Sequence, residues 1–154
     1  MKRPTSHHLP ALALITLAVS VALTGCGGGE TTALATSSMS KAEFVKRVEA
    51  ICAQARSEAI RYRPAGKGES QPEALAKAIE DTLLPAIGKA VDDLYALGAP
   101  AAEKEQTEAF LSALRQGVEE GEGLSTPALE KVEELLAPSG RLARRAGFLS
   151  CVYG

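Results

Sequence analysis

Apolar residues recur at intervals of three or four positions through most of the chain between residues 40 and 151. This spacing places them on one face of an α-helix, whereas a half-buried strand would alternate apolar and polar residues. No stretch shows convincing alternation bounded by hairpin turns. We therefore expect an all-α fold in which the apolar face of each helix packs against another helix.

The first expected helix begins at Ser40-Lys41-Ala42-Glu43, which has the form of a capping box. In a capping box the hydroxyl of the first residue accepts a bond from the backbone N–H of the fourth residue, whose acid reaches back. The helix should continue to about Tyr62 and stop before residues 63–68, which contain proline and glycine. Its apolar face is expected to hold Phe44, Val48, Ile51, Cys52, Ala55 and Ala59.

A second helix is expected to begin at Gln71-Pro72-Glu73, because proline is favoured in the first turn of a helix. Pro85 lies inside this run and should remove one backbone hydrogen bond, which kinks the helix or splits it in two. The sequence Leu97-Gly98-Ala99-Pro100 should end the helix. Its apolar face is expected to hold Leu75, Ile79, Leu83, Ile87, Val91 and Leu94.

Further helices are expected in the C-terminal part of the chain. One should run from about residue 101 to residue 120, and Gly121-Glu122-Gly123 should form a turn. A short helix should follow Ser125-Thr126-Pro127 and break at Pro138-Ser139-Gly140, where a final helix begins and continues to near Cys151. The residues expected to face inward are Phe110, Leu114, Val118, Leu129, Val132, Leu135, Leu136, Leu142, Ala146 and Leu149. Short connections between such helices predict a small antiparallel bundle of about four or five helices.

The N-terminal residues have the order of charge and hydropathy that is typical of a secretory signal peptide. Lys2 and Arg3 precede the apolar residues 9–23. The stretch 11–23 is too short to span a bilayer comfortably, because a spanning helix needs about 20 apolar residues. We therefore interpret this segment as a signal peptide that is removed.

Leu23-Thr24-Gly25-Cys26 resembles the lipobox of bacterial lipoproteins. The resemblance implies that the Cys26 thiol receives a diacylglyceryl group and that the chain is cleaved before it. Two or three acyl chains on one residue would give stable anchoring. The alternatives are a plain secreted protein, in which Cys26 is discarded or left as a free thiol, and an uncleaved anchor. We expect residues 1–25 to be the lipoprotein signal peptide, residues 26–39 to be the lipidated cysteine and a flexible Gly/Thr/Ser tether, and residues 40–154 to be the helical bundle domain.

Two cysteines follow Cys26, at positions 52 and 151. An even pair in an oxidising compartment forms a disulfide by default, so we expect a bond between Cys52 and Cys151. It would join the first helix of the domain to the last residues. The alternative is a pair of buried free thiols, or a redox or metal role. The chain has no CxxC motif. After Cys26 it has neither a histidine nor a third cysteine that could complete a zinc site with Cys52 and Cys151.

Charge and residue types exclude several classes of function. The chain has 17 basic and 19 acidic side chains, and loss of Lys2 and Arg3 leaves 15 basic residues and a formal charge of −4. A mildly acidic surface argues against nucleic-acid binding, which needs a concentrated basic face. The histidines, His7 and His8, also precede Cys26, so a catalytic triad that uses histidine is excluded. We expect no catalytic residue, no metal site and no cofactor.

Arg141, Arg144 and Arg145 form a local basic cluster near the C-terminus. We interpret it as the last turn of a helix, where cations suit the helix dipole. The alternative is a site for an anion or a partner. The acidic clusters of the mature chain are Glu80-Asp81, Asp92-Asp93 and Glu119-Glu120-Gly121-Glu122. We interpret them as solvated helix faces and a polar turn, because adjacent acids on a helix point about 100° apart.

Three segments carry a resemblance that spans the mature part. They are Ser40-Lys41-Ala42-Glu43-Phe44 leading to Ile51-Cys52, the helix break Leu97-Gly98-Ala99-Pro100, and Ala146-Gly147-Phe148 just before Cys151. In these features the chain resembles uncharacterised secreted or lipid-anchored helical proteins of high-GC actinobacteria. The resemblance implies a helical domain with paired cysteines and no established activity, and it supplies no catalytic residue.

From these features we expect a non-enzymatic, membrane-tethered domain on the extracytoplasmic face of the cell membrane, which binds a protein or another component of the envelope. One alternative is a carrier of a small apolar ligand, with a dry cavity near Pro85 lined by Leu83, Leu84 and Ile87. A filled core there would count against the carrier. A further alternative is a hydrolase that uses carboxylates alone, which requires two acids from separate helices to converge in a cleft.

Overall fold

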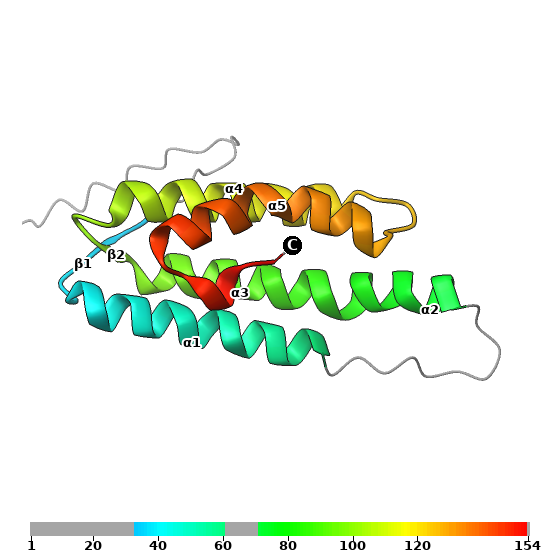
Figure 1. The fold of residues 1–154 in the computed structure, drawn as a ribbon, viewed down its shortest axis with the longest axis horizontal. Coiled ribbons are helices and arrows are strands. Elements are labelled where there is room, and N and C mark those ends of the chain that lie inside the picture. The colour runs from blue at the N-terminus through cyan, green and yellow to red at the C-terminus, as the bar shows by residue number, and fades with distance from the viewer. Residues whose placement is uncertain (1–32, 61–70, 154) are drawn as a thin grey trace, which may run out of the picture. The chain divides into compact units, whose positions relative to one another are not determined.

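The computed structural model describes residues 33–60 and 71–153 (Figure 1). These residues form four helices that pack together: α1 (Lys41–Ile60), α3 (Leu84–Leu97), α4 (Lys104–Glu122) and α5 (Leu129–Ala146). The short helix α2 (Gln71–Ala78) and the π-helix η1 (Ile79–Leu83) lead directly into α3, and the 3-10 helix η2 (Leu149–Cys151) follows α5. The expected all-α bundle is confirmed. The signal peptide, Cys26 and the expected break at residues 63–68 lie outside the described residues.

Successive helices of the bundle run in opposite directions, as expected for short connections (Figure 1). Helix α1 packs against α3, α3 against α4, and α4 against α5. Three phenylalanines that are at most 1 % exposed meet in the core. The ring of Phe148 meets Phe44 and Phe110 edge to face, with centroids 5.9 Å and 5.7 Å apart. Edge-to-face packing of this kind stabilises a core beyond simple area burial.

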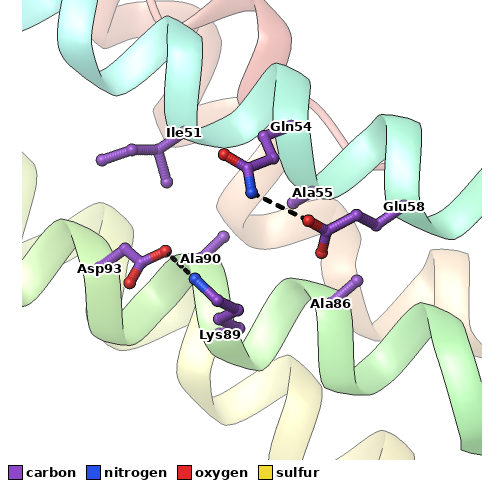
Figure 2. Close-up of a pocket in the computed structure, with 8 residues that line it drawn as sticks. All are labelled: Ile51, Gln54, Ala55, Glu58, Ala86, Lys89, Ala90 and Asp93. Carbon is purple, nitrogen blue, oxygen red and sulfur yellow. Dashed lines mark hydrogen bonds and ion pairs between the residues drawn. The ribbon is translucent and has the colours of Figure 1, made fainter.

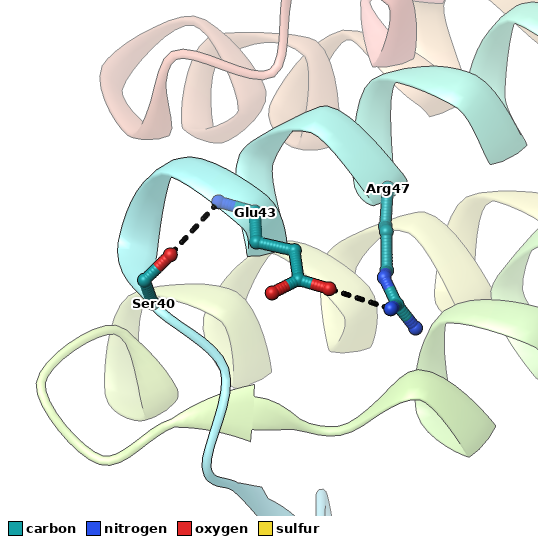
Figure 3. Close-up of polar contacts among 3 residues, drawn as sticks. All are labelled: Ser40, Glu43 and Arg47. Carbon is teal, nitrogen blue, oxygen red and sulfur yellow. Dashed lines mark hydrogen bonds and ion pairs between the residues drawn. The ribbon is translucent and has the colours of Figure 1, made fainter.

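Helix α1 begins with one of the two bonds of the predicted capping box, the one to the Ser40 hydroxyl, while the Glu43 carboxylate points to Arg47 (Figure 3). The hydroxyl of Ser40 accepts a hydrogen bond from the backbone N–H of Glu43 at 3.3 Å, which satisfies one of the free N–H groups of the first turn. The Glu43 carboxylate binds the guanidinium of Arg47, one turn later, at 2.6 Å. An acid that lies four residues before a base on the same helix stabilises that helix.

The segment from Gln71 to Leu97 is a continuous helical run that contains a wider turn just before Pro85. The backbone N–H of Leu84 binds the carbonyl of Ile79, five residues earlier, as in a π-helix. A proline ring clashes with the carbonyl four residues before it and offers no N–H. The wider turn accommodates Pro85 without ending the helix.

The π-turn also explains why the prediction that Leu75 faces the core is wrong. Leu75 is 43 % exposed, whereas Ala74 and Ala78 are buried. One extra residue in a turn rotates the preceding segment by about 100° relative to the following one. The buried face of α2 therefore lies one position away from the face that an unbroken helical period predicts.

The packed domain begins earlier than residue 40, so the expected tether boundary needs correction. Leu34 is 1 % exposed, and its N–H donates to the Glu108 carboxylate at 3.3 Å. Strand β1 (Thr36–Ser37) pairs in parallel with strand β2 (Ala99–Pro100). Gly98 ends α3 with φ 67°, and a Cβ there would lie 2.8 Å from the Ala35 carbonyl oxygen. Residues 34–39 are therefore part of the domain rather than of a free tether.

Helix α5 is continuous, so the expected break at Pro138-Ser139-Gly140 is wrong. Pro138 is exposed, so water can reach the carbonyl that loses its partner. Ser139 and Gly140 are buried, and the Ser139 hydroxyl donates to the Leu136 carbonyl at 2.7 Å. A proline inside a helix costs about 3 kcal/mol, and we attribute the survival of α5 to its packing against α4.

The chain after α5 also differs from the expected final helix. Gly147 adopts φ 80° and ends α5, a role that glycine fills without a Cβ penalty. Phe148 then turns into the core, where it is 1 % exposed. Leu149, which was expected to face inward, is 66 % exposed in η2. The left-handed turn at Gly147 breaks the helical period on which that expectation rested.

Candidate functional site

The predicted disulfide joins Cys52 of α1 to Cys151 of η2, with the two Cα atoms 5.0 Å apart. Both residues are 0 % exposed, and 99 positions separate them in the sequence. The pairing expected from cysteine counting is confirmed. A buried bond of this kind is shielded from solution thiols, which supports a structural role.

The C-terminal residues are held on α1 by hydrogen bonds on either side of the disulfide. The Glu49 carboxylate accepts from the backbone N–H of Ser150 at 3.0 Å and 3.1 Å, and also from its hydroxyl. Arg56 donates to the Val152 carbonyl at 2.8 Å. The Tyr153 hydroxyl donates to the Cys52 carbonyl at 3.4 Å, and burial raises the pKa of Tyr153 to about 12. These contacts fasten the tail to α1 on both sides of the disulfide.

The acidic clusters contribute surface ion pairs in the described part of the chain. Asp81 pairs with Lys77, Asp93 with Lys89, and Asp92 with Arg115 at 3.3 Å. Among the described residues there is no group of three or more His, Cys, Asp or Glu side chains that could hold a metal ion. Acids of two clusters do meet at the surface, because Asp92 of α3 lines a hollow of about 170 Å³ with Glu119 and Glu122 of α4. Arg115 lies in the same hollow and pairs with Asp92.

A polar seam lies between α1 and α3 (Figure 2). Gln54 donates to Glu58 at 2.9 Å on α1, while Lys89 binds Asp93 at 2.5 Å on α3. The hydrogen bond and charge of Asp93 raise the pKa of Lys89, and Glu58 on the facing helix adds to the effect. The enclosed space is about 10 Å³, which holds at most one water molecule. This seam has no room for a ligand.

An apolar surface lies where the end of α1 meets the starts of α2 and α5. Two adjoining hollows, of about 630 Å³ and 220 Å³, share Leu75 and Leu129 in their walls. We call this surface the end groove. It is lined by Ala59, Ile60, Gln71, Pro72, Ala74, Leu75, Ala78, Ile79, Leu83, Thr126, Pro127, Ala128, Leu129 and Glu130.

The end groove exposes large apolar side chains to solvent. Ile60 is 74 % exposed, Leu75 43 % and Leu129 36 %. Glu130 is the one ionisable side chain among the lining residues of these two hollows. Scattered exposed leucines are ordinary, but a grouping around a hollow indicates a binding surface.

The end groove lies at the opposite end of α1 from the strands β1 and β2. Helix α1 begins beside β1 and ends at Ile60, 20 residues later. A helix of this length spans about 30 Å. We call the end that holds Leu34 and the strands the strand end (Figure 1). The groove is therefore remote from the point at which the N-terminal segment enters the domain.

The region around Pro85 departs from the cavity that the carrier alternative requires. Leu84 and Ile87 are each 0 % exposed and belong to the packed core. Leu83 is partly buried and lines the smaller hollow of the end groove. In place of the dry pocket that the carrier alternative requires, the structure has a filled core at Leu84 and Ile87 beside an open surface hollow.

The basic cluster lies where the sequence predicts a helix terminus. Arg144 and Arg145 are in the last turn of α5, and Arg141 is in the turn before it. All three are exposed. Nothing in the described part of the chain forms an ion pair with their guanidinium groups. The helix dipole favours such cations in the last turn of α5.

Sequence reasoning did not find the end groove. The helical period predicts that Leu75 and Leu129 face inward, and it does not place Ile60 on the apolar face of α1. The sequence does show one common feature of Leu75 and Leu129: each lies near the start of a helix, shortly after Pro72 or Pro127. That feature does not reveal that the two helix starts lie beside each other.

The described helices include none that is long and apolar enough to cross a membrane. No protein-family model matches the chain, and neither the curated proteins nor the solved structures that were compared with it include a match.

Proposed function

We propose that this protein is a lipid-anchored, extracytoplasmic, non-enzymatic domain that binds another envelope protein through the end groove. The observation that carries the proposal is the exposed apolar grouping of Ile60, Leu75 and Leu129 around two adjoining hollows. Apolar side chains grouped around a hollow and bordered by polar residues are typical of a binding groove.

The anchoring part of the proposal rests on the resemblance of Leu23-Thr24-Gly25-Cys26 to a lipobox and on the disulfide. Disulfides persist in oxidising compartments and are rare in the cytosol. The eight residues 26–33 would link an acylated Cys26 to the strand end. The end groove, about 30 Å away along α1, would then be directed away from the anchored end and toward the envelope space.

The chemistry of the end groove indicates the kind of segment that would fit it. An amphipathic helix presents apolar side chains at intervals of three or four residues, and it docks them in an apolar groove. A basic residue on that helix would complement Glu130 at the edge. Full burial of one leucine contributes roughly 1.5–3 kcal/mol. Because Ile60, Leu75 and Leu129 are only partly exposed, they would supply a part of the binding free energy, and contacts around the groove would supply the rest.

Site-specific photo-crosslinking in the producing cell tests the binding surface. A photoreactive amino acid is placed at Leu75 or Leu129, and at Leu149 as the matched control, because Leu149 is also exposed and apolar but lies away from the groove. We expect one protein adduct from the groove positions and none from Leu149. Leu75→Ser with Leu129→Ser should prevent the adduct from a probe at Ile60, while the melting temperature changes little.

Equal adducts at all positions, or adducts unaffected by the double substitution, would refute the proposed surface. Mass spectrometry of the adduct also separates the two binding alternatives. A volume of about 630 Å³ lies within the usual range of small-ligand sites, so an adduct of lipid-like mass would favour a carrier of an apolar ligand instead.

Membrane fractionation of the wild type and Cys26→Ala tests the anchor separately. We expect the wild type in the detergent phase, with acyl mass on Cys26, and the variant outside it. If both forms are soluble and cleaved elsewhere, the protein is a diffusible secreted domain and the anchor is refuted.

A further inference from the structure

Arg141, Arg144 and Arg145 form a compact basic surface on α5, which we call the arginine stripe. Residues three and four apart on a helix are neighbours, so the three guanidinium groups share one side of α5. The buried residues Ser139 and Ala143 lie on the other side, toward the core. The stripe therefore faces solvent as a unit.

Most other cations of the described residues form ion pairs, although the exposed Lys46 does not and Arg56 binds only a backbone carbonyl. Arg47, Lys89 and Arg115 each pair with an acid on the same or a neighbouring helix. On α5 itself Lys131 pairs with Glu134 at 2.9 Å. Within residues 33–60 and 71–153 the stripe has no such pairing, and its three guanidinium groups are adjacent, so this concentrated positive charge can bind an external anion.

The outer face of α5 is divided by charge along its length. Glu130, Glu133 and Glu134 are in the half that begins at the end groove, and the three arginines are in the other half. The helix dipole favours cations in the last turn. It accounts less well for Arg141, which lies five residues before Ala146, because the effect fades beyond one turn.

The stripe lies toward the strand end of the bundle. Phe148, which comes two residues after α5, contacts Phe44 in the first turn of α1. Phe110, in the second turn of α4, contacts Phe148 as well. The C-terminal turn of α5 is thus close to the end at which Leu34 enters the domain (Figure 1).

We propose that the arginine stripe binds the phosphate groups of anionic phospholipids in the membrane that holds the protein. This inference rests on the proposed anchor at Cys26. The eight residues 26–33 extend to at most about 29 Å, so the acyl chains would keep the strand end near the headgroups. Guanidinium groups bind phosphate oxygens in a bidentate manner, and contact through the stripe would hold the end groove away from the bilayer.

Vesicle binding by the chain without acyl groups tests the inference independently of the anchor. The probe protein is residues 26–154 with Cys26→Ser, which contains the whole described core from Leu34 to Tyr153. Its fold is checked by circular dichroism and by the intact disulfide. Cosedimentation is measured with phosphatidylcholine vesicles that contain about 30 % phosphatidylglycerol, and with pure phosphatidylcholine vesicles.

We expect partitioning onto the anionic vesicles that falls roughly 100-fold when the three arginines are replaced by alanine. The matched control is Lys77→Ala with Lys89→Ala and Lys131→Ala, which changes the net charge equally at sites outside the stripe. We expect the control to keep most of the binding. Salt at about 0.5 M should abolish binding by the parent chain, because the Debye length becomes only a few ångströms.

Equal losses in both triple variants would overturn the inference, because they would reflect net charge and not the stripe. Equal binding to neutral vesicles, or displacement by millimolar inorganic phosphate, would overturn it too. Failure here leaves the Cys26 fractionation result unaffected, and failure of the anchor leaves this binding measurable.

The acylated protein provides a second readout. It is placed in the same two kinds of vesicle and treated with phenylglyoxal, which modifies accessible arginines. Modification of Arg141, Arg144 and Arg145 should fall several-fold on the anionic surface, whereas modification of Arg115, three turns into α4 and away from the strand end, should not change. Equal modification of the stripe on both surfaces would contradict the inference.

Discussion

Replacement of Gly117 by alanine tests whether the close approach of α4 and α5 holds the bundle in its observed form. A Cβ at Gly117 would lie 2.8 Å from the carbonyl oxygen of Leu135 and 3.0 Å from Cδ2 of Leu136. The Leu136 methyl group can rotate away. The Leu135 carbonyl belongs to the backbone of α5, so relief of that contact requires the two helices to separate.

Two opposing terms set the expected magnitude. Alanine is favoured over glycine inside a helix by about 1 kcal/mol. Overpacking of a tight interface costs about 1–3 kcal/mol, and a backbone contact belongs in the upper part of this range. We expect Gly117→Ala to lower the free energy of unfolding by about 1–2 kcal/mol.

Gly88→Ala is the matched control, because Gly88 lies inside α3 and receives the same intrinsic gain. The nearest atom to a Cβ there is Cγ1 of Val118 at 3.8 Å, an ordinary contact. We expect Gly88→Ala to raise the free energy of unfolding by about 0.5–1 kcal/mol. The two variants should therefore change the free energy of unfolding in opposite directions and differ by roughly 1.5–3 kcal/mol.

Urea denaturation followed by circular dichroism, with the disulfide intact, measures both values. If the free energy of unfolding falls with urea concentration at the same slope in each variant, a shift of the midpoint reports a change in stability. If Gly117→Ala is as stable as the wild type or more stable, the helices are not in tight contact at this point. The explanation given for the survival of α5 through Pro138 would then fail as well.

The remaining predictions concern the fastening of the C-terminal tail. Replacement of both Cys52 and Cys151 by alanine should lower the free energy of unfolding by up to about 4.7 kcal/mol, because the disulfide closes a loop of about 100 residues in the unfolded chain. Urea denaturation measures this loss. A loss below about 1 kcal/mol would contradict the stabilising role of the disulfide. Burial raises the pKa of Tyr153 from 10.0 to about 12, so the neutral phenol favours the folded state. That contribution is complete below pH 10 and is lost as the pH rises to about 12, and it amounts to about 2–3 kcal/mol. Tyr153→Phe should remove this pH dependence, as measured by thermal unfolding between the two pH values, and an unchanged dependence would refute the assignment.

The sequence determined most of the local structure, because the signals concerned act within one or two turns. The hydroxyl of Ser40 starts α1, Pro72 lies in the first turn of α2, and Gly98 ends α3. The disulfide was predictable for a different reason, since only Cys52 and Cys151 follow Cys26.

The tertiary structure decided what depends on neighbours far away in the sequence. Whether α5 continues through Pro138 depends on its packing against Gly117 of α4. Whether Leu34 belongs to a tether or to the core depends on the pairing of β1 with β2. Whether Leu75 faces the core depends on the π-turn that accommodates Pro85.

The end groove shows the same division. Its apolar residues are visible in the sequence, but their grouping requires the starts of α2 and α5 to meet the end of α1. A helical period states which face of a helix is apolar, and it does not state which helix covers that face. Burial energy is gained between elements, so only the packed fold determines which apolar side chains remain exposed for a partner.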